Sequence, residues 1–416
     1  MTFLAFFLST FLSLFFRKRN VVFWAMISLV AMLFTFNNYW IERAGPEFMG
    51  KHFGASMIVS LVLIIHPVTY RVLRRNTFIW GITYVLLYYC FWALWGVYNN
   101  QPDVLSDIRT TAPLFLGYLL GIRSYEEGNQ QVFKFFIFLG LVGGAFRLIE
   151  ISSGMYFLSH DLSYFICVSC IIVLVTMGNS FFPLFMLLIY SILFGYSRSI
   201  WIFLLTGIVF VIFFRERLSS VMVFKKFVFI IIILLLTLIG SRTLITENRL
   251  NKLALRFKTA DYQSRYVQNR FILLKTALDE FKYSPILGTG SGSRLVGFDL
   301  NYLDTNNGEF DYMEPHNLYV CILWKMGLIG FILFLLLIVL PVFKSLFFLQ
   351  KQRNKIEKMG KDKQEVFFVA LSVSVANLAF YLVDASFAHT EMTFLGFYFF
   401  GLLSEFLRKA KEKKLA

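Results

Sequence analysis

The sequence predicts an all-α polytopic membrane protein, and three observations carry that prediction. Of the 416 residues, 58% are hydrophobic and only 16% are charged, whereas soluble domains carry about 25% charged residues. The apolar residues form long runs separated by short basic turns. The 51 Phe and 20 Tyr suit a lipid-facing surface with aromatic belts at the membrane interfaces.

About 12 apolar stretches qualify as transmembrane helices, because roughly 20 residues cross the hydrocarbon layer. We interpret the shorter stretch 1–16, which precedes Arg17-Lys18-Arg19, as a short or interfacial helix or as a first span with an outer N-terminus. The segment 111–122 is also short and is expected to extend back toward Ile108. The predicted spans are 21–40, 54–73, 77–98, 111–122, 132–149, 157–177, 181–195, 199–214, 227–241, 316–343, 366–387 and 391–407.

The basic turns indicate which side of the membrane each loop occupies. Lys and Arg accumulate in cytoplasmic turns, and the turn 344–365 carries seven of them. Alternating the spans from the basic residues 17–19 places this turn and the tail 408–414 inside. The same distribution accounts for the net charge of +15 without nucleic acid as a partner.

Three regions follow from this topology. They are an N-terminal transmembrane bundle (1–241), a large outer loop with amphipathic helices (242–315), and C-terminal transmembrane helices with a basic cytoplasmic tail (316–416). The outer loop is divided by charge. Residues 242–294 carry ten Lys and Arg against four acids, and residues 295–315 carry five acids and no Lys or Arg. This division suggests a site for an anionic substrate.

Two helices and a glycine-rich stretch are predicted in the basic part of the loop. Apolar residues at helical spacing predict helices over 250–260 and 262–283. The apolar face of the second helix is expected to consist of Phe271, Leu274, Leu278 and Phe281. In the stretch 288–293 glycines alternate with Thr and Ser, but no Gly-Lys-Ser/Thr follows, so it is not a P-loop. We favour a connecting turn, with phosphate contact as the alternative.

Three arginines near the predicted outer face are candidates for binding. Arg198 lies in a tight turn between two spans, where it is either functional or a snorkelling arginine. Arg265 and Arg270 lie on the predicted loop helix, and their spacing of five residues directs them to different sides. Each of them alone is most simply a solvated charge.

His316 is the candidate for proton transfer. It begins the helix that follows the outer loop, and a histidine with a pKa of about 6.5 can accept a proton from a hydroxyl at neutral pH. A lone histidine is more often structural, but its neighbours Glu314 and Asn317 favour function and are accessory candidates. In the acidic part, we interpret Glu309 and Asp311 as a solvated edge, with metal binding as the alternative.

Four motifs occur along this part of the chain. They are Gly-Tyr-Ser-Arg-Ser at a span junction, Asn269-Arg270, Ser-Pro-Ile-Leu-Gly-Thr-Gly, and His316-Asn317-Leu318-Tyr319 followed by Gly327 and Gly330. Together they resemble the O-antigen ligase/polymerase family. The motifs cover 181–343, and the topology resembles the family over the remainder. The resemblance implies a GT-C-like, inverting glycosyltransferase in the bacterial inner membrane, with its large loop on the periplasmic or extracellular side.

The resemblance also implies substrates and roles. The donor would be an undecaprenyl-diphosphate-linked oligosaccharide, and the acceptor a glycan or lipid A-core. Arg198 and Arg270, together with Arg265, would hold the diphosphate, whose oxygens match planar guanidinium groups. His316 would activate or position the acceptor hydroxyl, without a metal or other cofactor. Membrane lipids and a chain-length regulator are the other expected partners.

The shared motifs do not separate polymerases, which join carrier-linked repeats, from ligases, which move the polymer onto lipid A-core. We favour a polymerase, because the Phe-rich and otherwise unpatterned spans fit the more variable branch. A secondary transporter or flippase is the alternative from another class; it would have internal repeats and a midplane site. We find no repeat, and ionisable residues within spans are few, mainly Lys325, Asp384 and His66. A structural scaffold would leave the outer arginines and His316 unexplained.

Overall fold

The computed structural model describes part of the chain, and the secondary structure in this part is helical apart from one short hairpin. In that hairpin β1 (Glu47–Phe48) pairs antiparallel with β2 (Lys51–His52). The predicted spans 21–40, 54–73 and 227–241 lie outside the described residues, as does most of 181–195. The described residues are 47–48, 51–52, 79–101, 104–127, 129–153, 160–176, 188–189, 191–192, 198–215, 265–293, 295, 315, 317–383 and 390–412.

The longer helices in this part of the chain overlap predicted spans, with one helix from the large polar loop and one short helix in addition. Four predictions, 77–98, 132–149, 157–177 and 199–214, agree with the observed helices to within a few residues. The helices are α6 (Ile79–Tyr98), α7 (Val104–Glu127), α8 (Asn129–Ser153), α9 (His160–Thr176), α11 (Arg198–Arg215), α14 (Arg265–Phe281), α15 (Leu318–Lys351), α16 (Arg353–Lys358), α17 (Lys361–Phe380) and α18 (Thr390–Glu412).

Several predicted boundaries were wrong, because charged residues end a hydropathic run without ending a helix. The segment 111–122 is the middle of the 24-residue α7. The span predicted at 316–343 continues to Lys351 through what was expected to be a turn, and α16 follows it. The span predicted at 366–387 starts earlier, at the polar residues of the first turn of α17, and ends at Phe380.

Length and composition support a membrane protein. Within the described residues, three helices have windows long and apolar enough to cross a bilayer: Val132–Ile149, Leu318–Lys351 and Lys361–Phe380. Ser163–Thr176 and Ser199–Phe214 are shorter apolar helices. The prediction of an all-α membrane protein is therefore confirmed in its coarse form. The number of spans, the side of the large loop and the three-region division stay predictions.

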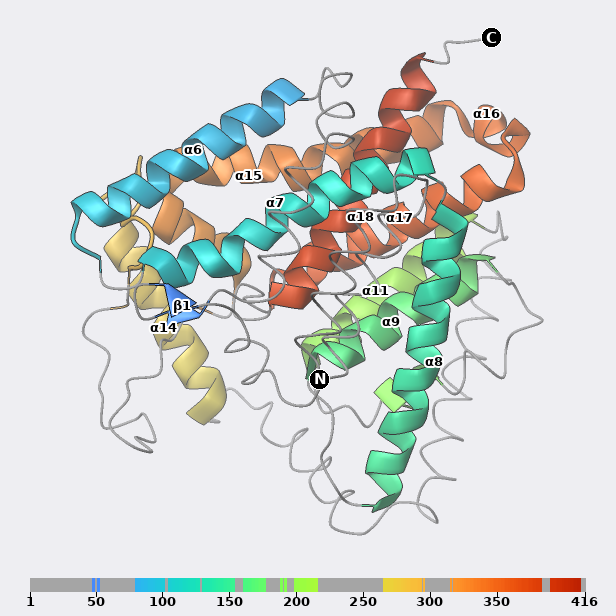
Figure 1. The fold of residues 1–416 in the computed structure, drawn as a ribbon, viewed down its shortest axis with the longest axis horizontal. Helices are drawn as coiled ribbons and strands as arrows, with labels where there is room; N and C mark the ends of the chain where they lie inside the picture. Colours follow the sequence, from blue (N-terminus) through green and yellow to red (C-terminus); the bar gives the residue numbers. More distant parts are fainter. Residues whose placement is uncertain are drawn as a thin grey trace.

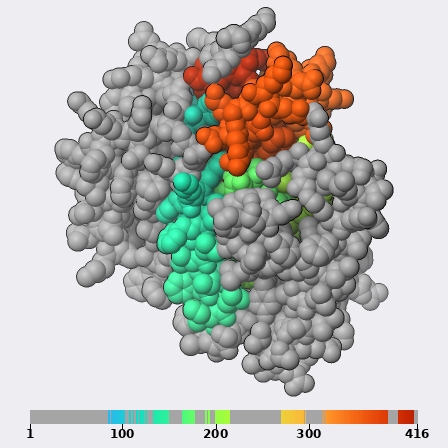
Figure 2. Space-filling model, turned by 90° about the vertical axis from the view of Figure 1, so that its right-hand side faces the viewer, coloured from blue at the N-terminus to red at the C-terminus, as the bar shows by residue number. Residues whose placement is uncertain are grey.

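Helices α6, α7, α15, α17 and α18 run in broadly similar directions, whereas α8 lies at a steep angle to them (Figure 1). The most extensive contact joins α7 to α18, and α17 also packs against α18 and α11. Helix α14 and helix α16 lie near opposite ends of this group (Figure 1). Figure 2 views the molecule from the side of α16 and shows the region around it, in orange, beside α8 in teal.

Small residues and hydroxyl pairs hold α7 against α18. A Cβ added to Gly121 would lie 1.9 Å from the carbonyl oxygen of Tyr398, so only glycine permits the observed approach of the two backbones. Two hydrogen bonds between buried hydroxyls cross the same interface, Tyr118 to Ser404 and Ser124 to Tyr398. Each of these four hydroxyls therefore has a partner inside the protein, which offsets the cost of burying it.

Candidate functional site

The N-terminus of α15 is anchored to the C-terminal end of α17. Asn317 caps α15, because its side-chain oxygen accepts a hydrogen bond from the Val320 N–H at 3.1 Å. The Asn317 amide also donates to the Leu382 carbonyl at 3.0 Å, and the Leu318 N–H donates to the Tyr381 carbonyl at 3.0 Å. Asn317, a predicted accessory residue, is therefore a helix cap that joins two helices.

The N-terminus of α11 reaches the same end of α17. Near the start of α11, the Phe203 ring lies 6.2 Å from the ring of Phe380, the last residue of α17, and 4.8 Å from Tyr164 of α9. The Tyr164 hydroxyl in turn donates to the Asn377 side-chain oxygen at 2.7 Å. Arg198 is the first residue of α11. The backbone of Arg198 and the start of α15 thus lie at one end of the bundle.

Helix α14 packs against α15 through a face that begins at Arg270. Leu273 and Ala277 are buried, and Glu280 accepts a hydrogen bond from the Trp324 indole N–H at 2.8 Å. Positions 270, 273, 277 and 280 are separated by three, four and three residues. Arg270 therefore lies on the same helical face as the other three residues. The Arg270 side chain is exposed.

This face differs from the apolar face predicted for α14. Phe271 is 51% exposed and Leu278 is 36% exposed, so the predicted apolar face is not the face that packs against α15. Ala277 on the buried face is small, and a small side chain lets packed helices approach closely. The exposed apolar residues of α14 remain available for contact with lipid.

Helix α15 is interrupted at Gly327, and residues 284–293, which we call the docking loop, bind to the interruption. The 34 residues of α15 would measure about 51 Å as one straight helix, more than the ~30 Å of a bilayer core. Gly327 has φ +65 and ψ −172, which leaves helical backbone groups on both sides without their usual partners. Four backbone hydrogen bonds from the loop supply partners: Leu328 N–H to Pro285 O (2.9 Å), Ile329 N–H to Ile286 O (3.3 Å), Thr289 N–H to Trp324 O (3.0 Å) and Gly290 N–H to Lys325 O (3.0 Å).

The glycines of the docking loop are required by this contact. Gly288 has φ +74, and a Cβ there would lie 2.4 Å from both the Gly327 nitrogen and the Lys325 carbonyl oxygen. A side chain is therefore excluded both by backbone conformation and by space. The predicted connecting turn has a structural role that the sequence did not reveal. The described backbone groups of the docking loop contact other parts of the protein. These contacts do not support the alternative prediction that the loop contacts phosphate.

An ion pair is buried beside the same interruption. The Lys325 ammonium lies 3.0 Å and 2.9 Å from the two carboxylate oxygens of Asp107 in the first turn of α7. Their side chains are only 3% and 5% exposed. One of these oxygens also accepts the Gly292 N–H of the docking loop at 2.7 Å. A charge in an apolar span is costly unless it is paired, and here the pair joins three segments.

Aromatic side chains of α6 also donate hydrogen bonds to backbone groups at the interruption and in the docking loop. The Trp92 indole donates to the Lys325 carbonyl at 2.8 Å, and the Tyr88 hydroxyl donates to the Met326 carbonyl at 2.6 Å. The Trp95 indole donates to the Gly288 carbonyl at 3.2 Å. The polar groups released by the break are thereby satisfied inside the protein, as a membrane requires.

The structure describes the predicted site residues unequally. Arg270 and Asn317 are described fully, whereas Arg198 and Arg265 are described by backbone alone, as the first residues of α11 and α14. His316 and Glu314 lie outside the described residues, as do Glu309 and Asp311. Within the described part of the chain, no three His, Cys, Asp or Glu residues gather as a metal site would need.

Sequence reasoning missed three features: Asp107, Trp92 and the binding partner of the docking loop. Lys325 was noted as an ionisable residue within a predicted span. Because a charge within a span is costly, its presence there alone indicates a partner. Its partner Asp107 lies 218 residues away, in a segment that was assigned to an outer turn. Nothing in the local sequence of either residue identifies the other.

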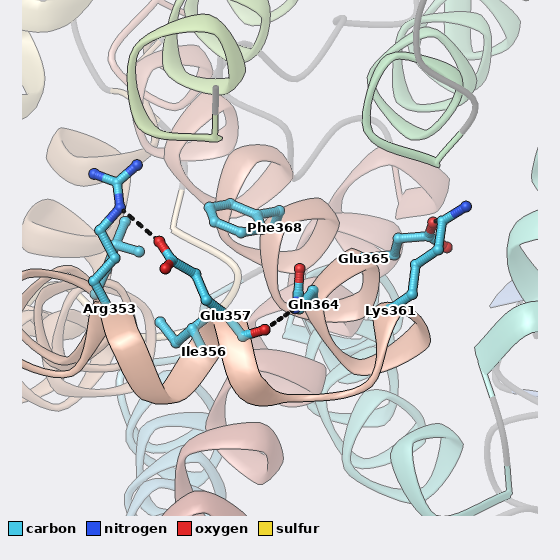
Figure 3. A pocket seen from close by; sticks show the side chains of 8 residues that line it. Arg353, Ile356, Glu357, Lys361, Gln364, Glu365 and Phe368 are labelled. Carbon is cyan, nitrogen blue, oxygen red and sulfur yellow. Dashed lines mark hydrogen bonds and ion pairs between the residues drawn. The ribbon is translucent and has the colours of Figure 1, made fainter. Parts of the chain in front are cut away.

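A pocket of about 160 Å³ lies at the other end of α15, away from this site (Figure 3). It is lined by residues of α15, α16 and α17, including Arg353, Glu357, Lys361 and Glu365. Its charges pair with each other, Arg353 with Glu357 at 3.5 Å and Lys361 with Glu365 at 3.9 Å. The pocket therefore presents no surplus of positive charge for an anionic substrate.

The fold and the polar site define an α-helical membrane protein in which the segment 284–293 is built into a broken, membrane-spanning type of helix. Residues 183–335 match the family described as Wzy_C, O-Antigen ligase. This segment contains α11, α14, the docking loop and the start of α15 with its break. The predicted resemblance to the O-antigen ligase/polymerase family is thereby confirmed over 183–335. No curated protein matches the chain.

Proposed function

We propose that the protein transfers an undecaprenyl-diphosphate-linked glycan to an acceptor hydroxyl, and that it polymerises the repeat units of an O-antigen or a similar surface polysaccharide. The match of 183–335 supports an O-antigen ligase- or polymerase-type function in a bacterial membrane. The polymerising reaction and the lipid-linked donor go beyond that match. The enzyme would act in the inner membrane, with loop 242–315 periplasmic or extracellular and the C-terminus cytoplasmic.

One observation carries the proposal: the matched segment contributes the starts of both α11 and α15, and each of them contacts the C-terminal end of α17. Helix α14 is fixed against α15 near the same end by Trp324 and Glu280. These contacts support a site formed by the elements that carry Arg198, Arg270 and the residue preceding Asn317. A transporter would place its site at the midplane of the membrane instead.

The proposed chemistry assigns the arginines to the donor and His316 to the acceptor. Arg198 and Arg270, with Arg265, would bind the diphosphate and stabilise its charge as the glycosyl bond breaks. His316 would take the proton from the acceptor hydroxyl as the new bond forms with inversion. Because a helix N-terminus disfavours a cation, its place before α15 favours the neutral imidazole that a base requires.

Site variants test these roles in a strain that lacks the gene, at matched protein levels. His316→Ala is expected to lower transfer about 10²- to 10⁴-fold, the usual contribution of a general base. Arg198→Lys keeps the charge but loses the planar fork, so we expect transfer to fall sharply with folding intact. Lys252→Ala serves as the control and is expected to keep wild-type activity. Normal polysaccharide from both site variants would contradict the proposed roles.

The ligase reaction is the second candidate, because the matching family is described as a ligase. Electrophoresis of surface polysaccharide from a strain without the gene separates the two. Loss of a polymerase leaves single repeats on lipid A-core, whereas loss of a ligase leaves polymer on the carrier and none on the core. An unchanged pattern would contradict both reactions and favour a transporter or a scaffold. A chain-length regulator would be an additional partner of a polymerase.

A further inference from the structure

The buried pair of Asp107 and Lys325 has no part in the proposed chemistry, yet it occupies the centre of the docking-loop contact. Lys325 belongs to the last turn of α15 before the break at Gly327. Asp107 comes from α7, outside the segment 183–335 that matches the family. The proposed site therefore depends on a carboxylate from the N-terminal half of the chain.

A single carboxylate holds both the lysine and the loop. One Asp107 oxygen lies 2.9 Å from the Lys325 ammonium and accepts the Gly292 N–H at 2.7 Å. The Ser291 hydroxyl donates to the Val104 carbonyl at 3.2 Å, so the first turn of α7 contacts the loop twice. Withdrawal of the carboxylate would leave a buried ammonium and a buried N–H without these partners at the same moment.

The docking loop in turn fixes α14 relative to α15. The loop follows α14 directly, and the Ser284 N–H bonds to the Phe281 carbonyl at 3.1 Å. On its other side the loop joins both halves of α15 across the break. The position of Arg270 relative to the start of α15 is thereby set by the loop and by the Trp324–Glu280 hydrogen bond.

We propose that Asp107 and Lys325 are positioning residues for glycan transfer: their pair locks the docking loop into the break in α15 and so aligns α14 with the start of α15. This inference rests on the proposed function, because the elements it aligns carry the proposed donor-binding and acceptor-activating residues. Neither residue touches substrate. Misplacement of reacting groups by about 1 Å can cost 10²-fold in rate, which sets the scale of the expected effect.

The test compares Asp107→Asn/Lys325→Met with Tyr118→Phe, in purified full-length protein. The double variant removes both charges together, because Asp107→Asn alone would leave Lys325 charged and buried, which strongly destabilises the fold. Tyr118→Phe is the matched control: it removes a buried polar contact from the same helix, α7, far from the loop. The three measurements are Tm, the rate of trypsin cleavage after the exposed Lys282, and kcat per folded molecule. The donor is the lipid-linked repeat unit extracted from cells that lack the gene.

The double variant is expected to keep a Tm within a few degrees of the wild type. Its cleavage after Lys282 should be about 10-fold faster, because cleavage requires the adjoining loop to open. Its kcat per folded molecule should fall about 10- to 100-fold. Tyr118→Phe should lower Tm and leave cleavage and kcat unchanged, as a purely structural contact does.

A double variant with wild-type cleavage and wild-type kcat would overturn the proposal. So would a loop that opens without loss of kcat, since the pair would then hold the loop without aligning the site. A wild-type protein that transfers no glycan would overturn the proposed function instead. In that case the cleavage rates would still decide whether the pair locks the loop.

Discussion

Two buried contacts in this protein are built by opposite means. Helix α7 packs against α18 through side chains and close glycines, whereas the docking loop joins α15 mainly through backbone hydrogen bonds, beside the ion pair between α7 and α15. The first contact is spread over many residues along both helices. In the second, the backbone groups at the break depend on a few partners from the loop and from α6. We therefore expect the α7–α18 contact to tolerate change gradually and the docking-loop contact to fail as a unit.

The largest loss of stability is expected at the break. Gly327→Val places a β-branched residue at φ +65 and a Cβ 2.3 Å from the Ile286 carbonyl oxygen. Strain of about 1–3 kcal/mol and overpacking of about 1–3 kcal/mol should add, so little folded protein should be recovered. Size-exclusion chromatography in detergent measures the folded fraction. Gly360→Ala is the control, because nothing lies within 4 Å of its added Cβ, and it should behave as wild type.

A smaller loss is expected in the α7–α18 contact. Gly121→Ala introduces a Cβ 1.9 Å from the Tyr398 carbonyl oxygen, so the two helices must separate. No positive φ adds strain there, and overpacking alone costs about 1–3 kcal/mol. Thermal unfolding should show a stable but weakened protein. A loss as complete as that of Gly327→Val would remove the distinction between the two contacts.

The hydroxyl pairs of the same interface should contribute less than its glycines. Tyr118→Phe leaves the buried Ser404 hydroxyl without this partner and should cost about 1–2 kcal/mol. Tyr118→Phe/Ser404→Ala removes both hydroxyls and should recover part of that loss. A double-mutant cycle measured by thermal unfolding gives the coupling between the two residues. Additive effects of the two single variants would contradict a hydrogen bond between the two hydroxyls.

The smallest effect is expected for the exposed ion pair on α14. The Lys282 ammonium lies 2.6 Å from Asp279, and the two side chains are 73% and 49% exposed. This hydrogen bond lowers the pKa of the Asp279 carboxyl, but water screens the interaction. Lys282→Gln should leave the Tm unchanged at pH 7. A Tm as low as that of Tyr118→Phe would show that exposure is a poor guide to the strength of ion pairs in this protein.

Periodicity and hydropathy predicted most of the described helices, but they did not predict how the large loop joins the bundle. The end of α15 was placed at 343 because Lys344 is charged, although the helix continues to Lys351. The stretch 288–293 was recognised as glycine-rich, but its need for glycine comes from Gly327 and Lys325, which are distant in sequence. Asp107 was overlooked because the polar residues around it were not recognised as the beginning of a helix, α7. Local patterns report local structure, and these features depend on contacts between distant segments.

For the candidate site too, the sequence predicted some residues and missed others. Residue chemistry and a family resemblance pointed to Arg198, Arg270 and His316, and the match of 183–335 supports the family. The resemblance left out Asp107, because that residue lies in a segment without motifs. Asn317 was expected to be accessory to catalysis, and the structure shows it as the cap of α15.

The central claim is that Arg198, Arg270 and His316 converge at one end of α17. Short bifunctional thiol reagents test it directly on cysteine pairs 198/270, 198/316 and 270/316, with the four natural cysteines replaced. We predict cross-links in all three pairs, together with none between cysteines at 198 and 354, because Asn354 belongs to α16 near the other end of the bundle. Absence of cross-links in all three site pairs, in variants that fold and reach the membrane, would contradict the account.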